Sequence, residues 1–158
     1  MAKTAIEMVE EFNTYITFVV ELKSIKEEHW NIPIAEGKWT LKDILSHLML
    51  WDKYFYDEAI EPIKNGSPLT SRHLNFNEFN ENARAYATTQ TVVSLNDQFI
   101  EYRTKIINAT SGLEEEEYIK EYKDGDKKKF TIRSYLRAFI SHDKHHKKQI
   151  LKYLKTIN

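Results

Sequence analysis

The chain has 158 residues, enough for one domain with a sizeable core, because a chain of about 150 residues buries roughly two-thirds of its unfolded surface. It has only four glycines and three prolines, which argues against a β-sandwich or barrel with frequent tight turns and favours a mostly helical protein. The absence of cysteine excludes disulfide scaffolds, thiolate metal sites and cysteine nucleophiles, and the net charge of −1 argues against a globally basic nucleic-acid coat.

Apolar residues spaced three or four positions apart predict the first two helices. The first covers about residues 5–28, and Pro33 prevents its continuation. The second opens at Thr40, because Thr40 and Asp43 have the spacing of a capping box, and it stops before Gly66.

A third helical region is expected from about residue 75 to 109, with an interruption near 88–91 where polar and β-branched residues cluster. An acidic stretch at 114–117 and a turn-like run at 123–126 follow, and they predict a short extra helix or an irregular segment. The fourth helix is expected over about 131–154. Together these segments predict an all-α, up-down four-helix bundle with long loops.

The whole chain, residues 1–158, is expected to form a single domain, because no linker or repeat divides it. The N-terminal residues carry no apolar signal core, and no stretch approaches the roughly 18 apolar residues of a membrane span. With no cysteine in addition, the sequence predicts a cytoplasmic protein without a membrane partner.

Candidate chemistry lies in the histidines of the fourth helix. At about 100° per residue, His146 falls inside the buried arc, His142 at its margin, and His145 further toward solvent. Two histidines separated by four positions present their imidazoles side by side on one helix face, as a divalent metal requires. His145 remains an alternative ligand.

The second helix offers a third imidazole, His47, at the margin of its apolar stripe. Three neutral imidazoles leave metal positions open, which is typical of a catalytic site rather than a structural one. The residues that could orient the imidazole rings are Asp43, Asp143 and Gln149, with His145 beside them. Asp143 faces the buried arc and therefore needs a partner.

Two motifs carry a resemblance to a known family. The run GKWTLKDILSHL at 37–48, followed by Trp51 and Asp52, resembles the second helix of the DinB/YfiT-like superfamily. The run HDKHHKKQI at 142–150 is similar to the family's fourth-helix pattern, although Lys147 and Lys148 stand where Arg-Gly is common. The family holds its metal with three histidines, and those positions map onto His47, His142 and His146.

The resemblance implies a four-helix bundle, often a homodimer, with nickel, zinc or another divalent ion such as manganese or iron in a cleft. Family members include metal-dependent hydrolases and transferases or isomerases that use a low-molecular-weight thiol such as bacillithiol or mycothiol. The implied function is therefore a thiol-dependent S-transferase or a hydrolase acting on a small molecule. A transferase would need an exogenous thiol, because the chain has no cysteine.

An alternative rests on charge. Residues 127–158 sum to +9 and the preceding residues to −10, and Lys144, Lys147 and Lys148 lie on the outer side of the fourth helix. Such a face could bind an anion or nucleic acid, or it could simply be solvated and complement the helix dipole. Segment 76–82 and the Trp51 region also resemble the ClbS/DfsB branch of the superfamily, whose members are linked to protection from a genotoxin.

Overall fold

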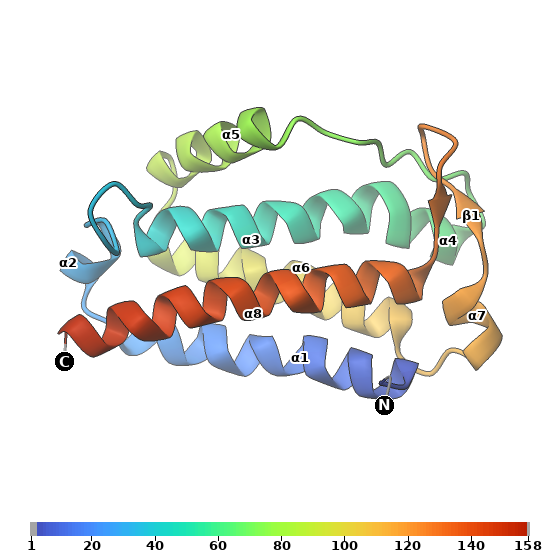
Figure 1. Cartoon of the computed structure of the whole chain (residues 1–158), viewed down its shortest axis with the longest axis horizontal. Helices are drawn as coiled ribbons and strands as arrows, with labels where there is room; N and C mark the ends of the chain where they lie inside the picture. The colour runs from blue at the N-terminus through green and yellow to red at the C-terminus, as the bar shows by residue number, and fades with distance from the viewer. Residues whose placement is uncertain (1–2, 158) are drawn as a thin grey trace.

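The computed structural model describes residues 3–157, and four long helices packed side by side form most of it (Figure 1). Within this bundle α6 packs against both α1 and α3, and α8 lies across from it against the same two helices. The all-α four-helix bundle predicted from the sequence is confirmed. The four long helices are α1 (Ala5–Glu21), α3 (Leu41–Phe55), α6 (Val92–Thr110) and α8 (Ile132–Ile157).

Shorter elements connect the long helices. The second predicted helix is one helical run that ends at Gly66, whose left-handed φ of 71° closes it. A short helix and a two-stranded antiparallel hairpin fill the segment before α8 that was expected to be a short helix or irregular. These elements are η1 (Leu22–Ser24), α2 (Glu27–Trp30), the π-helical turn η2 (Tyr56–Ile60), α4 (Glu61–Asn65), α5 (Phe76–Thr88), α7 (Glu115–Ile119), β1 (Tyr122–Lys123) and β2 (Lys129–Phe130).

The third predicted helical region is two helices. It breaks at residues 89–91, close to the expected interruption, and Thr91 caps α6 by accepting from the backbone N–H of Ser94. The chain reverses there, so α5 runs back along α3 while α6 enters the bundle (Figure 1). Consequently α3 and α6 run in the same direction, and the predicted up-down order holds only when α5 is counted.

The predicted start of the second helix is confirmed in detail. The Thr40 hydroxyl accepts from the Asp43 backbone N–H at 3.0 Å, and the Asp43 carboxylate accepts from the Thr40 N–H at 3.1 Å. This capping box fixes the first turn of α3, and the apolar positions that follow then face the core. His47 lies in the second turn of this helix and is buried.

A buried ionic layer lies between the two apolar halves of the core. Arg103 of α6 donates to Asp52 of α3 at 2.8 and 3.1 Å, and to Asp143 of α8 at 2.9 and 3.2 Å. Its guanidinium carbon also lies 3.5 Å from the centre of the Phe12 ring. Burial raises the pKa of Asp143 to about 6, although Arg103 opposes that shift. Arg103 therefore joins α6 to the other three long helices in the middle of the bundle.

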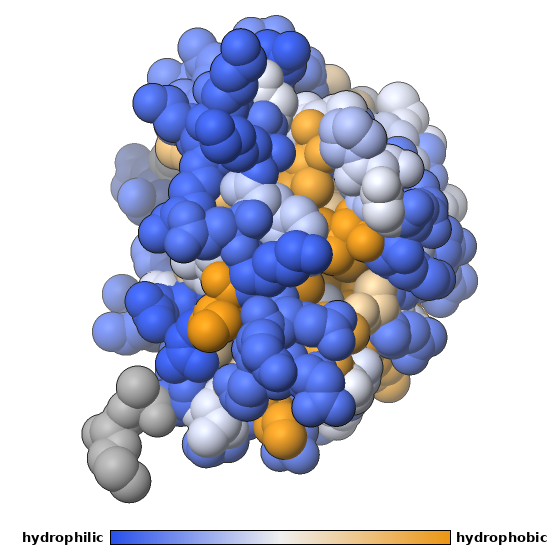
Figure 2. Space-filling model, turned by 90° about the vertical axis from the view of Figure 1, so that its right-hand side faces the viewer, coloured by the Kyte–Doolittle hydropathy of each residue, from blue (hydrophilic) through white to orange (hydrophobic). Residues whose placement is uncertain are grey.

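The end of the bundle that carries α7 and the hairpin has a largely hydrophilic surface, with hydrophobic side chains showing between the polar ones (Figure 2). Across residues 3–157, none of the helices combines the length and apolar character needed to cross a bilayer.

Candidate metal centre

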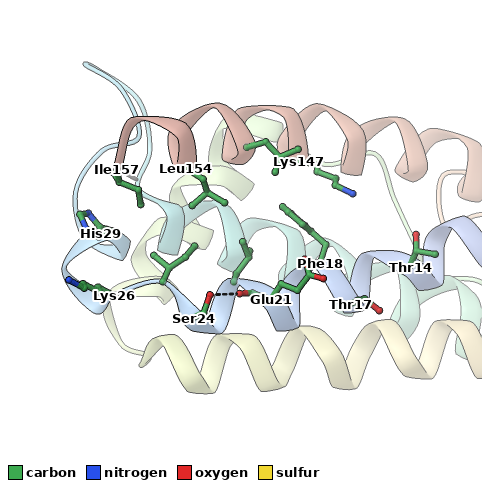
Figure 3. A pocket seen from close by; sticks show the side chains of 13 residues that line it. Thr14, Thr17, Phe18, Glu21, Ser24, Lys26, His29, Lys147, Leu154 and Ile157 are labelled. Atoms are coloured by element: carbon green, nitrogen blue, oxygen red, sulfur yellow. Dashed lines mark hydrogen bonds between the residues drawn. The ribbon is translucent and has the colours of Figure 1, made fainter.

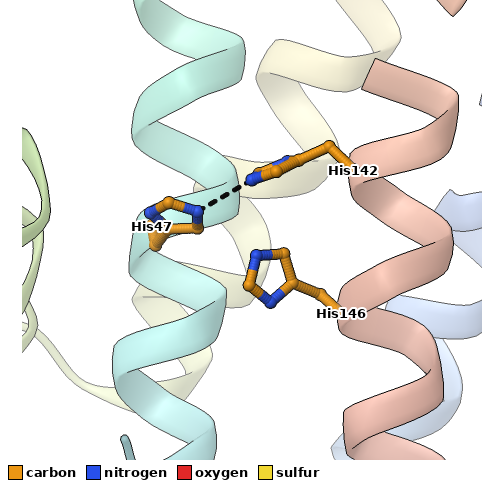
Figure 4. Close-up of side chains that lie close together, drawn as sticks. All are labelled: His47, His142 and His146. Carbon is orange, nitrogen blue, oxygen red and sulfur yellow. Dashed lines mark hydrogen bonds between the residues drawn. The ribbon is translucent and has the colours of Figure 1, made fainter. Parts of the chain in front are cut away.

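Three histidines from two helices converge on one point. His47 projects from α3, and His142 and His146 project from successive turns of α8 toward it (Figure 4). Each can offer one ring nitrogen such that the three nitrogens lie within 4.8 Å of one another. The structure thus brings together the three residues that the sequence indicated as metal ligands.

The local sequence explains this convergence. The four-residue spacing on α8 places the His142 and His146 rings 4.6 Å apart, measured between centroids. His47 lies 5.0 Å from each of them, because α3 and α8 are neighbours in the bundle. His47 and His146 are buried and His142 is half-buried, so solvent reaches the cluster from one side.

The protonation chemistry of the cluster fits a divalent metal. Burial, reinforced by the neighbouring imidazoles, lowers the pKa of His47 to about 4 and that of His142 to about 3. Burial also lowers the pKa of His146. All three rings are consequently neutral at pH 7, the form in which histidine binds metal.

Hydrogen bonds identify the nitrogen that each ring can offer. Gln149 Oε1 lies 2.8 Å from His146 Nδ1, so the amide oxygen accepts from Nδ1–H and His146 Nε2 is left free. His47 Nε2 and His142 Nε2 lie 3.0 Å apart, and one must donate to the other. All three Nε2 atoms therefore face a common centre.

One residue near the cluster was not predicted. Asn80 of α5 raises the pKa of His47, against the larger effect of burial, and it lines the same cleft. Its Oδ1 and His47 Nδ1 are both buried without a hydrogen-bond partner among the described residues. A buried donor and a buried acceptor in proximity form a natural pair once His47 carries its proton on Nδ1. Asn80 lies on α5, which the sequence predicted to be part of a bundle helix. The contact between Asn80 and His47 therefore could not be expected from the sequence.

Of the four residues expected to orient the rings, two lie beside the histidine cluster and two have other partners. Gln149 contacts His146 as expected. His145 is exposed, lines the cleft and has its ring centroid 5.1 Å from that of His146. Asp143 points into the core to Arg103, which supplies the partner it required. Asp43 is not brought to the cluster, because its carboxylate caps α3 and lies 3.7 Å from Arg84 Nε.

The lysines of α8 are exposed and do not line the histidine cleft. Lys144 forms an ion pair with Glu11 of α1 at 3.1 Å, and the Lys147 ammonium lies 4.9 Å from the centre of the Phe18 ring. Lys148 is exposed and borders a separate surface hollow with other lysines of this helix. Binding of an anion or nucleic acid on this face stays a prediction.

A cleft of about 540 Å³ opens beside the histidines, a size suited to a small molecule. Its walls are largely aromatic, and within the described part of the chain neither aspartate nor glutamate lines it. The lining residues are Trp39, His47, Trp51, Phe55, Arg72, His73, Leu74, Phe76, Asn80, Ala138, Phe139, His142, His145 and His146.

The mouth of this cleft is positioned by the hairpin before α8. Gly125 N–H donates to Ser71 O at 2.6 Å, and the Asp126 carboxylate accepts from the His73 N–H at 2.7 Å. A side-chain carbon at Gly125 would lie only 2.9 Å from Thr70 O, so glycine permits this close approach. The hairpin therefore holds residues 70–73, including Arg72, at the cleft mouth.

A second, larger groove of about 770 Å³ lies between α1 and α8 (Figure 3). Phe18, Leu154 and Ile157 form part of its apolar surface, and Glu21, Lys26 and Lys147 border it. None of the three clustered histidines lines it. The concave surface that carries the histidine cluster is therefore the smaller cleft.

Fold and site together define a helical-bundle protein with three clustered histidines, able to hold a divalent metal, beside an open cleft. The DinB family profile matches residues 6–157, and the chain belongs to the DinB family. Its fold is similar to that of YfiT from Bacillus subtilis, described as a probable metal-dependent hydrolase with an unusual four-helix bundle topology. That likeness has a TM-score of 0.69 at 16% sequence identity, covering 97% of this chain and 85% of YfiT. No curated protein sequence matches the chain.

Proposed function

We propose that the protein is a divalent-metal-dependent hydrolase acting on a small molecule. The observation that carries this proposal is the convergence of His47, His142 and His146 at the base of an open cleft. Three neutral ligands leave coordination positions for water and substrate. Zinc or nickel fits a set of imidazoles best, and manganese or iron are the other candidates. YfiT, which shares the fold, is itself described as a probable metal-dependent hydrolase.

A divalent ion bound here would act as a Lewis acid and would lower the pKa of a water molecule or thiol. The chain's own residues have separate tasks. Gln149 fixes the His146 tautomer, and the Arg103 layer holds α3 and α8 at a constant separation next to the ligands. The aromatic walls exclude bulk water from one side of the cleft.

His145 is placed to move a proton. It lines the cleft, is exposed to solvent, and is not a member of the three-histidine cluster. An imidazole in this position can accept a proton from the attacking nucleophile and return it to the leaving group. We therefore assign His145 the role of general base and acid in the proposed reaction.

Thiol transfer is the second candidate function. It is favoured by the absence of aspartate and glutamate from the described lining of the cleft, since an anionic thiolate meets no opposing carboxylate there. The chain contains no cysteine, so the thiol would come from an exogenous low-molecular-weight compound. The two candidates share the metal and differ in the nucleophile.

The metal site is tested by elemental analysis of untagged protein after zinc loading and dialysis. We expect about one zinc per chain in the parent protein, and less than a tenth of that in His142→Ala/His146→Ala. His145→Ala is the matched control, because it removes an adjacent histidine outside the cluster. Equal zinc in the parent and in the double variant would refute the three-histidine site.

The reaction is tested with the zinc-loaded protein on two probes. Hydrolysis of p-nitrophenyl acetate reports water activation, and conjugation of 1-chloro-2,4-dinitrobenzene with added free cysteine reports thiol transfer. Zinc-dependent turnover of the ester that is lost in His47→Ala supports the hydrolase. Zinc-dependent conjugation without ester hydrolysis would overturn it in favour of the transferase.

A further inference from the structure

The wall of the cleft beside the histidines is a continuous set of aromatic rings. The Trp51 centroid lies 5.8 Å from that of Phe55, 5.9 Å from that of Phe76 and 6.0 Å from that of Phe139. Phe139 in turn lies 5.4 Å from His142. The wall therefore begins at the metal ligands and extends outward, so a bound molecule can touch both at once.

This wall is rigid on its inner side and exposed at its mouth. Phe79 stacks on Trp51 with centroids 3.8 Å apart and planes inclined by 19°, which fixes the indole ring from behind. Phe76, at the mouth, is 58% exposed. Among the exposed large hydrophobic side chains of the described residues, Phe76 is the only aromatic one. An exposed aromatic ring that continues a concave apolar wall marks a binding surface.

The charge of the cleft restricts the ligand further. Arg72 contributes a guanidinium at the mouth, where it forms an ion pair with Asp126 at 3.4 Å, and no acidic side chain of the described residues lines the walls. Three neutral imidazoles would leave the double positive charge of a bound divalent ion uncompensated. Such a site repels cations and favours an anionic donor group next to the histidines.

We propose that the ligand of this cleft is a small organic anion with a flat apolar body, such as an aromatic acid derivative. Its anionic donor group faces His47, His142 and His146, and its body lies against Trp51, Phe76 and Phe139. This inference rests on the proposed metal-dependent function and adds the class of substrate. A cleft of about 540 Å³ has room for one or two rings beside the donor group.

The test compares two probes that carry the same metal-binding group, benzohydroxamate and acetohydroxamate, by calorimetric titration of the zinc-loaded protein. Burial of one aromatic ring against the wall should make benzohydroxamate bind at least about tenfold more tightly. Equal affinities would overturn the proposed apolar body while leaving the metal site intact. If neither probe binds, the metal-dependent function itself fails, and the inference fails with it.

The wall is located with Phe76→Ser. This variant should lose most of the preference for benzohydroxamate and keep the affinity for acetohydroxamate, because Phe76 is exposed and its ring contacts Trp51 and His73, not the three clustered histidines. Val93→Ser is the matched control, since Val93 is 67% exposed on another helix and does not line the cleft. An unchanged preference in Phe76→Ser would refute the assignment of the wall.

The charge preference is tested with a cation of similar size. Benzylammonium should not compete with benzohydroxamate, and competition would refute the charge assignment.

Discussion

His47 Nε2 lies 3.0 Å from His142 Nε2, although 95 positions separate the two residues in the chain. One of these neutral rings must donate an Nε2–H to the other. Because both Nε2 atoms face the common centre, metal binding requires that proton to move to Nδ1 of the same ring. The hydrogen bond between His47 and His142 thus lies where the metal would bind. A metal ion in the site would replace this hydrogen bond with two metal–nitrogen bonds.

The lowered pKa values of the clustered histidines predict that zinc binding releases few protons. At pH 6, three histidines of ordinary pKa would together carry about two protons, all of which metal binding would displace. Here burial lowers the pKa of His47 to about 4 and of His142 to about 3, so these two rings are already neutral at pH 6 and only His146 can carry a proton. We expect release of at most about one proton, measured by calorimetry at pH 6 in buffers of different ionisation enthalpy. Release of about two protons would contradict the lowered pKa values.

The same pKa shifts predict how the stability of the metal-free protein depends on pH. Below pH 6.5 the unfolded chain protonates these histidines while the folded protein keeps them neutral. The contribution of these histidines to the free energy of unfolding is therefore fully present above pH 6.5, and it declines as the pH falls toward about 4. Each such histidine contributes a slope of up to about 1.4 kcal/mol per pH unit in this window.

Urea unfolding in the presence of EDTA at several pH values measures this slope. His142→Gln should unfold with a smaller decline between pH 6 and 4.5 than the parent, because its side chain does not titrate. His145→Gln is the control, since His145 is exposed and outside the cluster. Identical declines in the parent and His142→Gln would contradict the prediction.

Removal of the Arg103 side chain should strongly destabilise the bundle. Arg103→Met leaves the carboxylates of Asp52 and Asp143 buried without their cation, which costs about 3–5 kcal/mol of unfolding free energy. Asp143→Asn keeps the pair between Arg103 and Asp52 and should cost less. Chemical denaturation measures the loss of unfolding free energy in both variants, and the loss should be larger for Arg103→Met than for Asp143→Asn. An Arg103→Met variant as stable as the parent would contradict this prediction.

Asn80 should support the metal site without being a ligand. Asn80→Ala removes the side-chain acceptor that acts on His47, and loss of such a partner typically lowers metal affinity by about tenfold to a hundredfold. Asn77→Ala is the control, because Asn77 is exposed on the same helix. Competition with a zinc chelator measures the affinity. Equal zinc affinities of Asn80→Ala and Asn77→Ala would remove this role.

Gly125→Ala should alter the cleft mouth and leave the metal site unchanged. The added methyl group would lie 2.9 Å from Thr70 O and 3.0 Å from Ser71 O, so the loop at residues 70–73 must move. We expect weaker benzohydroxamate binding with unchanged zinc affinity, both measured by calorimetry. A loss of zinc affinity in this variant would show instead that the hairpin supports the histidines.

The features that follow from neighbouring residues could be predicted from the sequence. The capping box of Thr40 and Asp43 and the inward direction of His142 and His146 depend on positions three or four residues apart. The prediction for Asp43 as a residue near the ligands is not supported, because its carboxylate is occupied by that same cap. Local spacing thus indicated both the site and one residue that does not belong to it.

The features that depend on the reversal between α5 and α6 could not be predicted. The sequence showed that Asp143 needs a buried partner, but Arg103 lies 40 positions away on a helix whose facing side was unknown. Asn80 does not stand out in the sequence, because residues 75–109 have the pattern of one interrupted bundle helix. Only the antiparallel packing of α5 on α3 brings Asn80 to His47.

The hairpin that positions the cleft mouth lies outside the two apolar clusters that hold the bundle together, apart from the partly buried Phe130. The three clustered histidines come from α3 and α8, whereas the mouth is set by backbone contacts between residues 70–73 and the hairpin tip. Changes in the length or composition of that tip can therefore alter which molecules reach the cleft while the histidine cluster stays the same. In this architecture, the entrance can diversify independently of the cluster behind it.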